Sequence, residues 1–337
     1  METYQKISTV CLFILTMIAI AFVLSVTKTV LIPFIMAVFL ALVFSPLMAT
    51  LQIKLKLPRP VVLILTIGFF SILFLLVSFV TADSIENFAS NSDQYKNQVQ
   101  NIGVALAKTA AQLGFDVDEN SLQGTIKKIP FPQIIKTLST GVISLFSNTF
   151  LVIIFTIFLL SGQTIEKSES KSIISEIKSS VAKYVGTKTL VSGATGILTF
   201  IVLKIFQVEM AFMFATLTFL FNFIPTIGSI VAVVLPLPIL LLQFGFGASF
   251  FGCLALLGFI QITIGNVLEP KLMGESTGLH PVTILLSLTF WGLLWGVAGM
   301  FLSVPITASL SLIFSKFELT KPITDVFAGN FDKLKIS

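Results

Sequence analysis

The chain has 337 residues, of which 55% are hydrophobic and 11% charged, and its mean hydropathy is +1.01. A water-soluble domain carries about a quarter charged residues, so this composition excludes an ordinary soluble protein. The net charge of +5 comes mostly from lysines between apolar segments, and no arginine-rich or aromatic-interleaved basic motif is present, which argues against a nucleic-acid partner. The natural solvent of such a chain is lipid.

Several long segments contain no Asp, Glu, Lys or Arg: residues 29–53, 61–82, 137–165, 210–268 and 276–315. A hydrocarbon core of about 30 Å needs about 20 helical residues, so each segment is long enough to cross it. Helices are expected because no segment alternates like a barrel strand, and because lipid offers no partner to open sheet edges. The predicted fold class is all-α, a polytopic membrane bundle of about 8 spans plus re-entrant or broken helices.

The N-terminal part, residues 1–82, contains predicted spans at 10–27, 29–50 and 61–82. The first resembles a signal peptide, but a second apolar segment follows almost at once, so an uncleaved helix is favoured. Residues 83–139 are polar and contain glycine and proline breakers, which predicts a small insertion of amphipathic helices.

The C-terminal core is predicted to occupy residues 140–319, followed by a polar cytoplasmic tail at 320–337. Within the core, residues 163–189 are rich in Lys, Glu and Ser, with apolar residues at helical spacing. This pattern predicts a helix in the membrane interface, with a cytosolic partner helix as the alternative. The remaining predicted spans lie at 140–162, 189–207, 210–224, 228–244 and 247–267.

Residues 281–315 form an apolar segment too long for one crossing. The glycines near Gly296 predict a break into two arms, which would cross the membrane twice or form a re-entrant hairpin. The lysines of the loops 54–59 and 163–189 place both loops, and the C-terminal tail, on the cytoplasmic side. The insertion is then expected to face outward.

Proline and glycine interrupt two apolar regions. The first contains Asn222, Pro225, Gly228 and Pro236; the second contains Gly278, His280, Pro281, Gly292, Gly296, Gly299 and Pro305. Proline removes a backbone donor and leaves carbonyls without helical partners, and these must face protein or a water-lined cavity. The two regions are therefore candidates for hinges and for the lining of a transport pathway. The alternative is that they are kinks and sites of tight helix packing.

A third candidate is Glu269, which ends a long uncharged segment, follows Asn266 by one helical turn and precedes Pro270. A carboxylate at membrane depth is costly, so it suggests a proton or cation site, with Asn266 as a neutral oxygen ligand. The alternative is a polar helix end in which Glu269 pairs with Lys271.

Residues 274–278 spell GESTG, the G-x-S-x-G pattern of serine hydrolases. A nucleophile elbow needs a preceding strand and a histidine brought from elsewhere in the chain. Here a membrane helix is expected before the pattern, and the chain's one histidine, His280, adjoins Pro281. No zinc, phosphate-loop or dinucleotide motif is present either. We therefore predict no enzymatic activity, no cofactor and no metal site.

The sequence resembles the autoinducer-2 exporter family of bacterial membrane proteins. The resemblance rests on FIPTIGS at 223–229, NVLEPKLMG at 266–274, and GLHP at 278–281 with the glycine-broken segment that follows, and the layout agrees over nearly the whole chain. It implies an oligomeric helical carrier in the bacterial inner membrane that exports a small signalling molecule. Some members of the family are described instead as sodium(lithium)/proton antiporters.

Three hypotheses follow. The first is export of a small polar solute by alternating access, because a core with so little fixed charge suits a neutral cargo. The second is a cation/proton antiporter centred on Glu269. The third is a non-transporting scaffold or signalling protein. The expected partners are membrane lipid, a small polar solute, protons or sodium, and further copies of the same chain.

Overall fold

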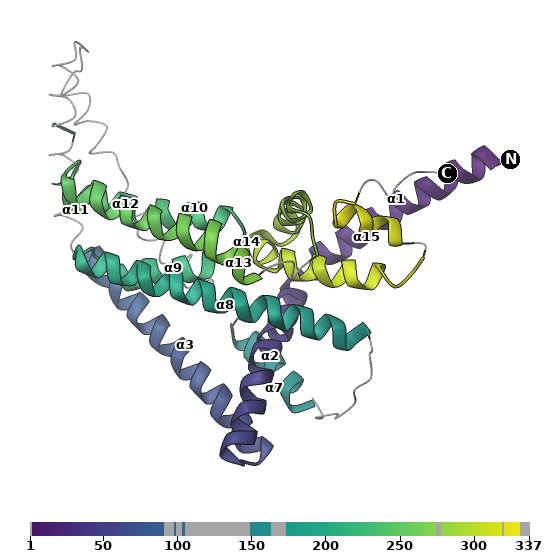
Figure 1. The fold of residues 1–337 in the computed structure, drawn as a ribbon, viewed down its shortest axis with the longest axis horizontal. Helices are drawn as coiled ribbons and strands as arrows, with labels where there is room; N and C mark the ends of the chain where they lie inside the picture. The colour runs from purple at the N-terminus through teal and green to yellow at the C-terminus, as the bar shows by residue number, and fades with distance from the viewer. Residues whose placement is uncertain are drawn as a thin grey trace, which may run out of the picture. The chain divides into compact units, whose positions relative to one another are not determined.

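A computed structural model describes residues 2–90, 98, 103–104, 149–162, 173–273, 278–318 and 320–330. All regular elements in these ranges are helices (Figure 1), which confirms the predicted all-α fold class. Six of the described helices are long and apolar enough to cross a membrane: Lys28–Lys54, Arg59–Ser84, Ser175–Ile205, Ile227–Phe244, Ala248–Leu268 and Pro281–Phe314. Shorter apolar helices lie at Ile14–Val26, Thr149–Gly162 and Ala211–Phe221.

The chain divides into two compact units. Unit 1 comprises Met1–Ile67, Asn148–Thr187 and Met273–Ser337, and unit 2 comprises Gly68–Ser147 and Lys188–Leu272. The division falls inside two continuous helices, α3 (Arg59–Ser90) and α8 (Ile173–Ile205), so each of these helices contributes residues to both units.

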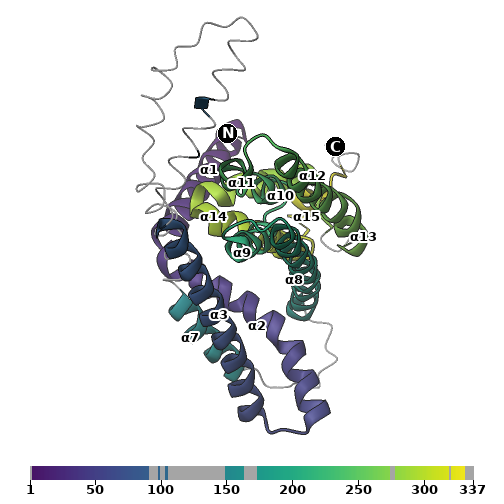
Figure 2. The same ribbon diagram turned by 90° about the vertical axis from the view of Figure 1, so that its left-hand side faces the viewer.

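Unit 1 is built around α1 (Glu2–Val26), α2 (Lys28–Leu55), α7 (Thr149–Gly162), α14 (Pro281–Phe314) and α15 (Lys321–Phe327). Helix α7 packs along α2, as Figures 1 and 2 both show. The core of the unit consists of large apolar side chains from α2, α8 and α14: Phe39, Val181, Tyr184, Val185, Trp291, Trp295, Leu302 and Val304.

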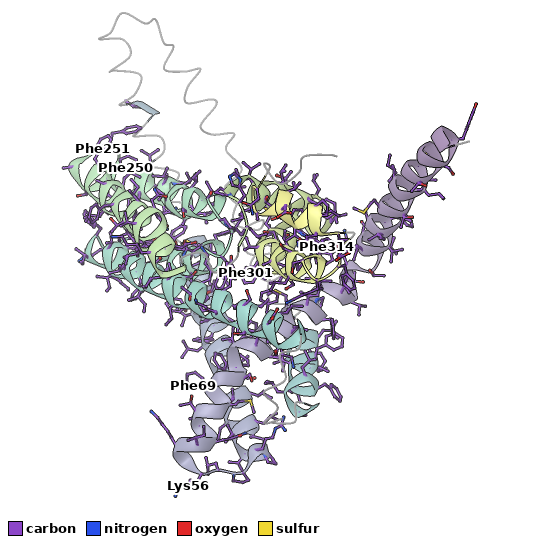
Figure 3. All side chains as sticks on the ribbon, turned by 45° about the vertical axis from the view of Figure 1, so that its right-hand side comes forward. Lys56, Phe69, Phe250, Phe251, Phe301 and Phe314 are labelled. Atoms are coloured by element: carbon purple, nitrogen blue, oxygen red, sulfur yellow. The ribbon has the colours of Figure 1, made fainter. Side chains whose placement is uncertain are left out.

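A tight turn joins α2 to α3. Lys56 ends α2 in the left-handed conformation, with φ 51°, and lies at the tip of this turn in Figure 3. The carbonyl of Pro58 then accepts hydrogen bonds from the first amides of α3. The guanidinium of Arg59 donates to the carbonyl of Leu160 at 2.8 Å, which satisfies one of the last carbonyls of α7.

Helix α14 is a hairpin, as the glycines predict. Gly296 has φ 64° and ψ −141°, a conformation that suits only glycine, and it separates arms at residues 281–295 and 297–314. The arms lie side by side, because the indole N–H of Trp291 donates to the hydroxyl of Thr307 at 3.3 Å. At about 1.5 Å per residue the arms are about 22 and 27 Å long, shorter than a hydrocarbon core of about 30 Å. These lengths favour a re-entrant hairpin.

The part of unit 2 between α8 and unit 1 that the structure describes consists of α9 (Ala211–Phe221), α10 (Ile227–Val234), α11 (Leu237–Phe244), α12 (Ala248–Ile262), the π-helix η1 (Thr263–Leu268) and α13 (Glu269–Met273). Helix α12 packs against α10 and α11. Phe250 and Phe251, labelled in Figure 3, lie in the first turn of α12, and their rings are in edge-to-face contact. The core includes Leu203, Met213, Leu240, Cys253 and Leu257, each no more than 2% exposed.

The structure corrects several predicted boundaries. Residues 163–189 and 189–207 were expected to be separate helices, but α8 continues without a break from Ile173 to Ile205. The change from polar to apolar composition near residue 189 marks a change of surroundings along one helix, because no proline interrupts it. The span expected at 210–224 ends at Phe221. The predicted insertion, residues 83–139, was expected to begin where the third span ends at residue 82, but α3 continues to Ser90. Most of the rest of the insertion lies outside the described residues.

Gly299→Ala should destabilise the hairpin. A Cβ at Gly299 would lie 1.9 Å from the carbonyl oxygen of Trp291, so the arms would have to separate. We expect a loss of about 1–3 kcal/mol or more, measured as a lower midpoint of thermal unfolding in detergent. Gly258→Ala in α12, where a Cβ meets nothing within 4 Å, is the control and should be neutral or slightly stabilising. Equal midpoints for the two variants would contradict the close approach of the arms.

Candidate functional site

One face of α8 buries a row of polar side chains inside unit 2. Lys188, Ser192, Thr195 and Thr199 follow one another at intervals of four, three and four residues, which places them on one side of the helix. Each is no more than 2% exposed. Polar groups are costly in a membrane interior and are usually retained for a function, so this α8 polar row is the candidate site.

A buried ion pair forms the first part of the site. The ammonium of Lys188 donates to Oε1 of Glu269, the first residue of α13. The two side chains are 2% and 18% exposed. Removing two charges from water costs several kcal/mol for each ion, and only a close partner offsets that cost. Lys188 and Glu269 therefore depend on one another.

A neutral hydrogen bond forms the second part. The amide nitrogen of Asn222 donates to the hydroxyl of Ser192 at 3.1 Å, and both side chains are at most 2% exposed. Asn222 directly follows the end of α9, and the chain then reverses through Pro225 to enter α10. Gly228 permits this reversal, because a Cβ there would lie 1.8 Å from the carbonyl oxygen of Phe221.

The π-helix η1 leads into Glu269. π-helical turns are rare overall, but those that occur often lie at functional sites. Gln261, two residues before η1, is 6% exposed, and within the described part of the chain its Oε1 accepts no hydrogen bond. A buried amide oxygen without a partner is uncommon in native proteins and suggests a place for a polar ligand or water.

One predicted contact of Glu269 is replaced, because its partner is Lys188 and not Lys271. Asn266 is exposed within η1, and its role as an oxygen ligand beside Glu269 stays a prediction. Sequence reasoning missed Lys188, because it assigned residues up to 189 to an interfacial helix, and it missed Ser192, because it treated 189–207 as a plain apolar span. The spacing of Lys188, Ser192, Thr195 and Thr199 was the signal that could have found them.

Beyond the polar row, Glu209 lies in the turn between α8 and α9. Its backbone N–H donates to Oε1 of Gln243 at 3.0 Å, which ties this turn to α11. Partial burial raises the pKa of the Glu209 carboxyl above its ordinary value. This contact fixes the turn at the end of α8, and Glu209 is not a member of the α8 polar row.

The GLHP sequence has a structural role in unit 1. Nδ1 of His280 accepts from the backbone N–H of Val282 at 3.3 Å and caps α14. The backbone N–H of His280 and the hydroxyl of Thr283 both donate to the carbonyl of Phe327, at 2.8 and 3.0 Å, and so hold the end of α15. Gly278 has φ 59° and introduces this cap; residues 274–277 of the GESTG pattern lie outside the described residues.

The remaining predicted positions are spread over both units. Gly292 and Gly299 lie at the contact between the arms of α14, where a Cβ would meet Met300 or Trp291. Pro305 lies in the second arm, and Pro236 separates α10 from α11. At the contact glycines the structure has tight helix packing, which was the alternative interpretation. That these glycines and prolines line a transport pathway stays a prediction, and the same holds for Pro270 and Pro281.

These features define a polytopic membrane protein with a buried polar site, the architecture of a transporter. A model of the AI-2E transporter family matches residues 12–318, and the chain belongs to this family. A Haemophilus influenzae protein named "Putative transport protein" is 30% identical over 306 residues, 84% of this chain and 85% of that protein. The AI-2 transport protein TqsA of Escherichia coli K12 is 29% identical over 290 residues, 82% of this chain and 83% of TqsA.

Lys188→Met and Glu269→Met should each destabilise the protein by about 3–5 kcal/mol, because each leaves a buried charge without its partner. The double variant should recover most of this loss, which thermal unfolding of all four proteins in detergent would measure as a double-mutant cycle. The pair Glu176–Lys316, at 2.7 Å with side chains 46% and 38% exposed, supplies the control. Glu176→Met should cost at most about 1 kcal/mol. If Lys188→Met and Glu269→Met lowered the free energy of unfolding as little as Glu176→Met does, burial would not be what makes the Lys188–Glu269 pair important.

Proposed function

We propose that this transporter exports a small, neutral, polar solute of the autoinducer-2 kind across the bacterial inner membrane, as an oligomeric carrier that works by alternating access. The observation that carries the proposal is the α8 polar row with its partners Glu269 and Asn222, buried beside the apolar core of unit 2. The name of TqsA supports the solute class by similarity.

The chemistry of the row favours a neutral cargo. The charges of Lys188 and Glu269 balance one another, so the site has no excess charge to attract an anion. Ser192 and Asn222 offer a hydroxyl and an amide, which exchange hydrogen bonds readily with the hydroxyl groups of a solute. The unpartnered amide oxygen of Gln261 adds an acceptor on α12.

Breaks in the helices of unit 2 supply places where the backbone can rotate. The connection between α9 and α10 contains Thr226 with φ 61°, and η1 interrupts the regular helix before Glu269. Both breaks adjoin a member of the site, Asn222 in one case and Glu269 in the other. Hinge motions concentrate at such element ends, so the solute site and the candidate hinges coincide.

Asn222→Leu should slow solute flux by about tenfold or more, because a hydrogen bond to the cargo is worth about 1–3 kcal/mol and 1.4 kcal/mol corresponds to a factor of ten. The measurement is efflux from liposomes containing the purified protein, against a panel of furanones, sugars and alkali cations. Thr216→Val on α9 is the control, because its hydroxyl donates to the carbonyl of Phe212 one turn earlier in the same helix.

Unchanged furanone flux in Asn222→Leu would remove the amide from the solute site. No flux of any panel member through the wild-type protein would instead support the hypothesis of a non-transporting scaffold.

A second candidate function is sodium or lithium/proton antiport, which the Lys188–Glu269 pair favours specifically. A small cation would compete with the lysine ammonium for the same carboxylate, so that cation binding and release of Lys188 become linked. Carboxylates are also the oxygen ligands that hard cations prefer.

Glu269→Gln should abolish proton-coupled sodium or lithium flux, because the neutral amide can neither release a proton nor balance a cation. Dye-reported pH changes in sodium-loaded liposomes would measure this flux. Glu176→Gln, which alters an exposed carboxylate, should leave it unchanged. Coupled cation flux that persists in Glu269→Gln would exclude the antiport mechanism at this residue.

A further inference from the structure

Unit 1 contains a partly open cavity of about 610 Å³ that is separate from the polar row. Its volume lies within the range of about 300–1,000 Å³ that pockets for organic molecules occupy. Residues from α2, α7, α8 and α14 line it: Ile35, Val38, Phe39, Ala41, Leu42, Phe158, Leu159, Gly162, Ile177, Lys178, Val181, Pro305, Ile306, Ser309 and Leu310.

The lining is hydrocarbon with one charged group. The hydroxyl of Ser309 donates to the carbonyl of Pro305 at 2.7 Å, so neither group needs a ligand. Lys178 is the charged residue among the lining residues. The neighbouring acid Glu176 is already paired with Lys316. A solute rich in hydroxyl groups would find few partners here, whereas an alkyl chain would be well accommodated.

Lys178 stands where a lipid headgroup is expected. The candidate span of α8 begins at Ser175, so Lys178 lies in its first turn, and its side chain is exposed. A lysine at this depth buries its aliphatic stem and directs its ammonium to the interface. The lysine bias assigns this side to the cytoplasm, where membranes carry anionic lipids.

We propose that this cavity binds an acyl chain of an anionic phospholipid, whose phosphate pairs with Lys178. The charge of the headgroup complements the lysine, and the apolar walls from four helices complement the chain. Gly162 lines the cavity at the end of α7, and a Cβ at this position would meet nothing within 4 Å. The lipid fills the space between α7 and the second arm of α14 and stabilises unit 1.

Native mass spectrometry of the purified full-length protein tests this proposal. The protein is released from detergent after equilibration with equal amounts of phosphatidylglycerol and phosphatidylcholine, and the retained lipids are counted. Wild-type protein should retain phosphatidylglycerol in preference, by severalfold. Lys178→Glu should lose this preference but still retain a lipid, because the hydrocarbon cavity is intact.

Gly162→Leu should reduce the retention of both lipids, because it adds a side chain to the lining at a position where a Cβ meets nothing within 4 Å, and so takes up part of the space. Lys183→Glu and Gly186→Leu are matched controls on α8, since neither residue lines the cavity and a Cβ at Gly186 meets nothing within 4 Å. Thermal unfolding in detergent confirms that each variant is folded.

Retention like that of wild type in both Lys178→Glu and Gly162→Leu would overturn the proposal. Equal effects of the control variants would do the same, because lipid binding would then not be localised to the cavity. If Gly162→Leu changed the oligomeric mass but not lipid retention, the cavity would be a contact between copies of the chain, and the lipid site would be rejected.

Discussion

The ion pair between Lys188 and Glu269 is the contact on which the interpretation of unit 2 depends. Lipid offers no alternative partner to a charged group, so a lysine in the middle of α8 is tolerated only if an acid reaches it. That acid comes from a position 81 residues away in the chain. The need to pair Lys188 fixes where η1 and α13 pass α8. It also favours a regular helix start for Glu269, where the position of its carboxylate is fixed.

Backbone amides and carbonyls in lipid also need partners within the protein, and this need governs the sharp reversals of the chain. Around Gly228 and Gly299 the chain turns back so closely that a Cβ would collide with a carbonyl oxygen. Close reversal lets the flanking helices satisfy their own amides and carbonyls up to the turn, which leaves little backbone to be solvated. Glycine therefore serves packing at these two positions, while Gly296 supplies the positive φ that bends the α14 hairpin.

The sequence was sufficient for the fold class and for most helix positions, because long uncharged segments have few alternatives to a spanning helix. It also located the break at Gly296, since a run of apolar residues too long for one crossing must bend where glycine permits. It misplaced the boundary within α8, because composition reports the surroundings of a helix and not its ends. Lys188 was missed for the same reason, and its pairing with Glu269 depends on a distant contact that no local pattern encodes. The contact between His280 and α15 likewise joins segments separated by the whole of α14.

The two sites differ in chemistry in a way that separates their ligands. The α8 polar row and its partners offer hydroxyls, an amide and a compensated ion pair, and an alkyl chain that separated Ser192 from Asn222 would leave both groups without partners at a cost of about 1–3 kcal/mol each. The cavity in unit 1 offers hydrocarbon walls and one ammonium group, so a polyhydroxylated solute would lose its hydrogen bonds to water without replacement. Each proposed site would thus disfavour the ligand proposed for the other through unsatisfied polar groups, not through size, so a polar cargo could be selected in a protein surrounded by a large excess of lipid.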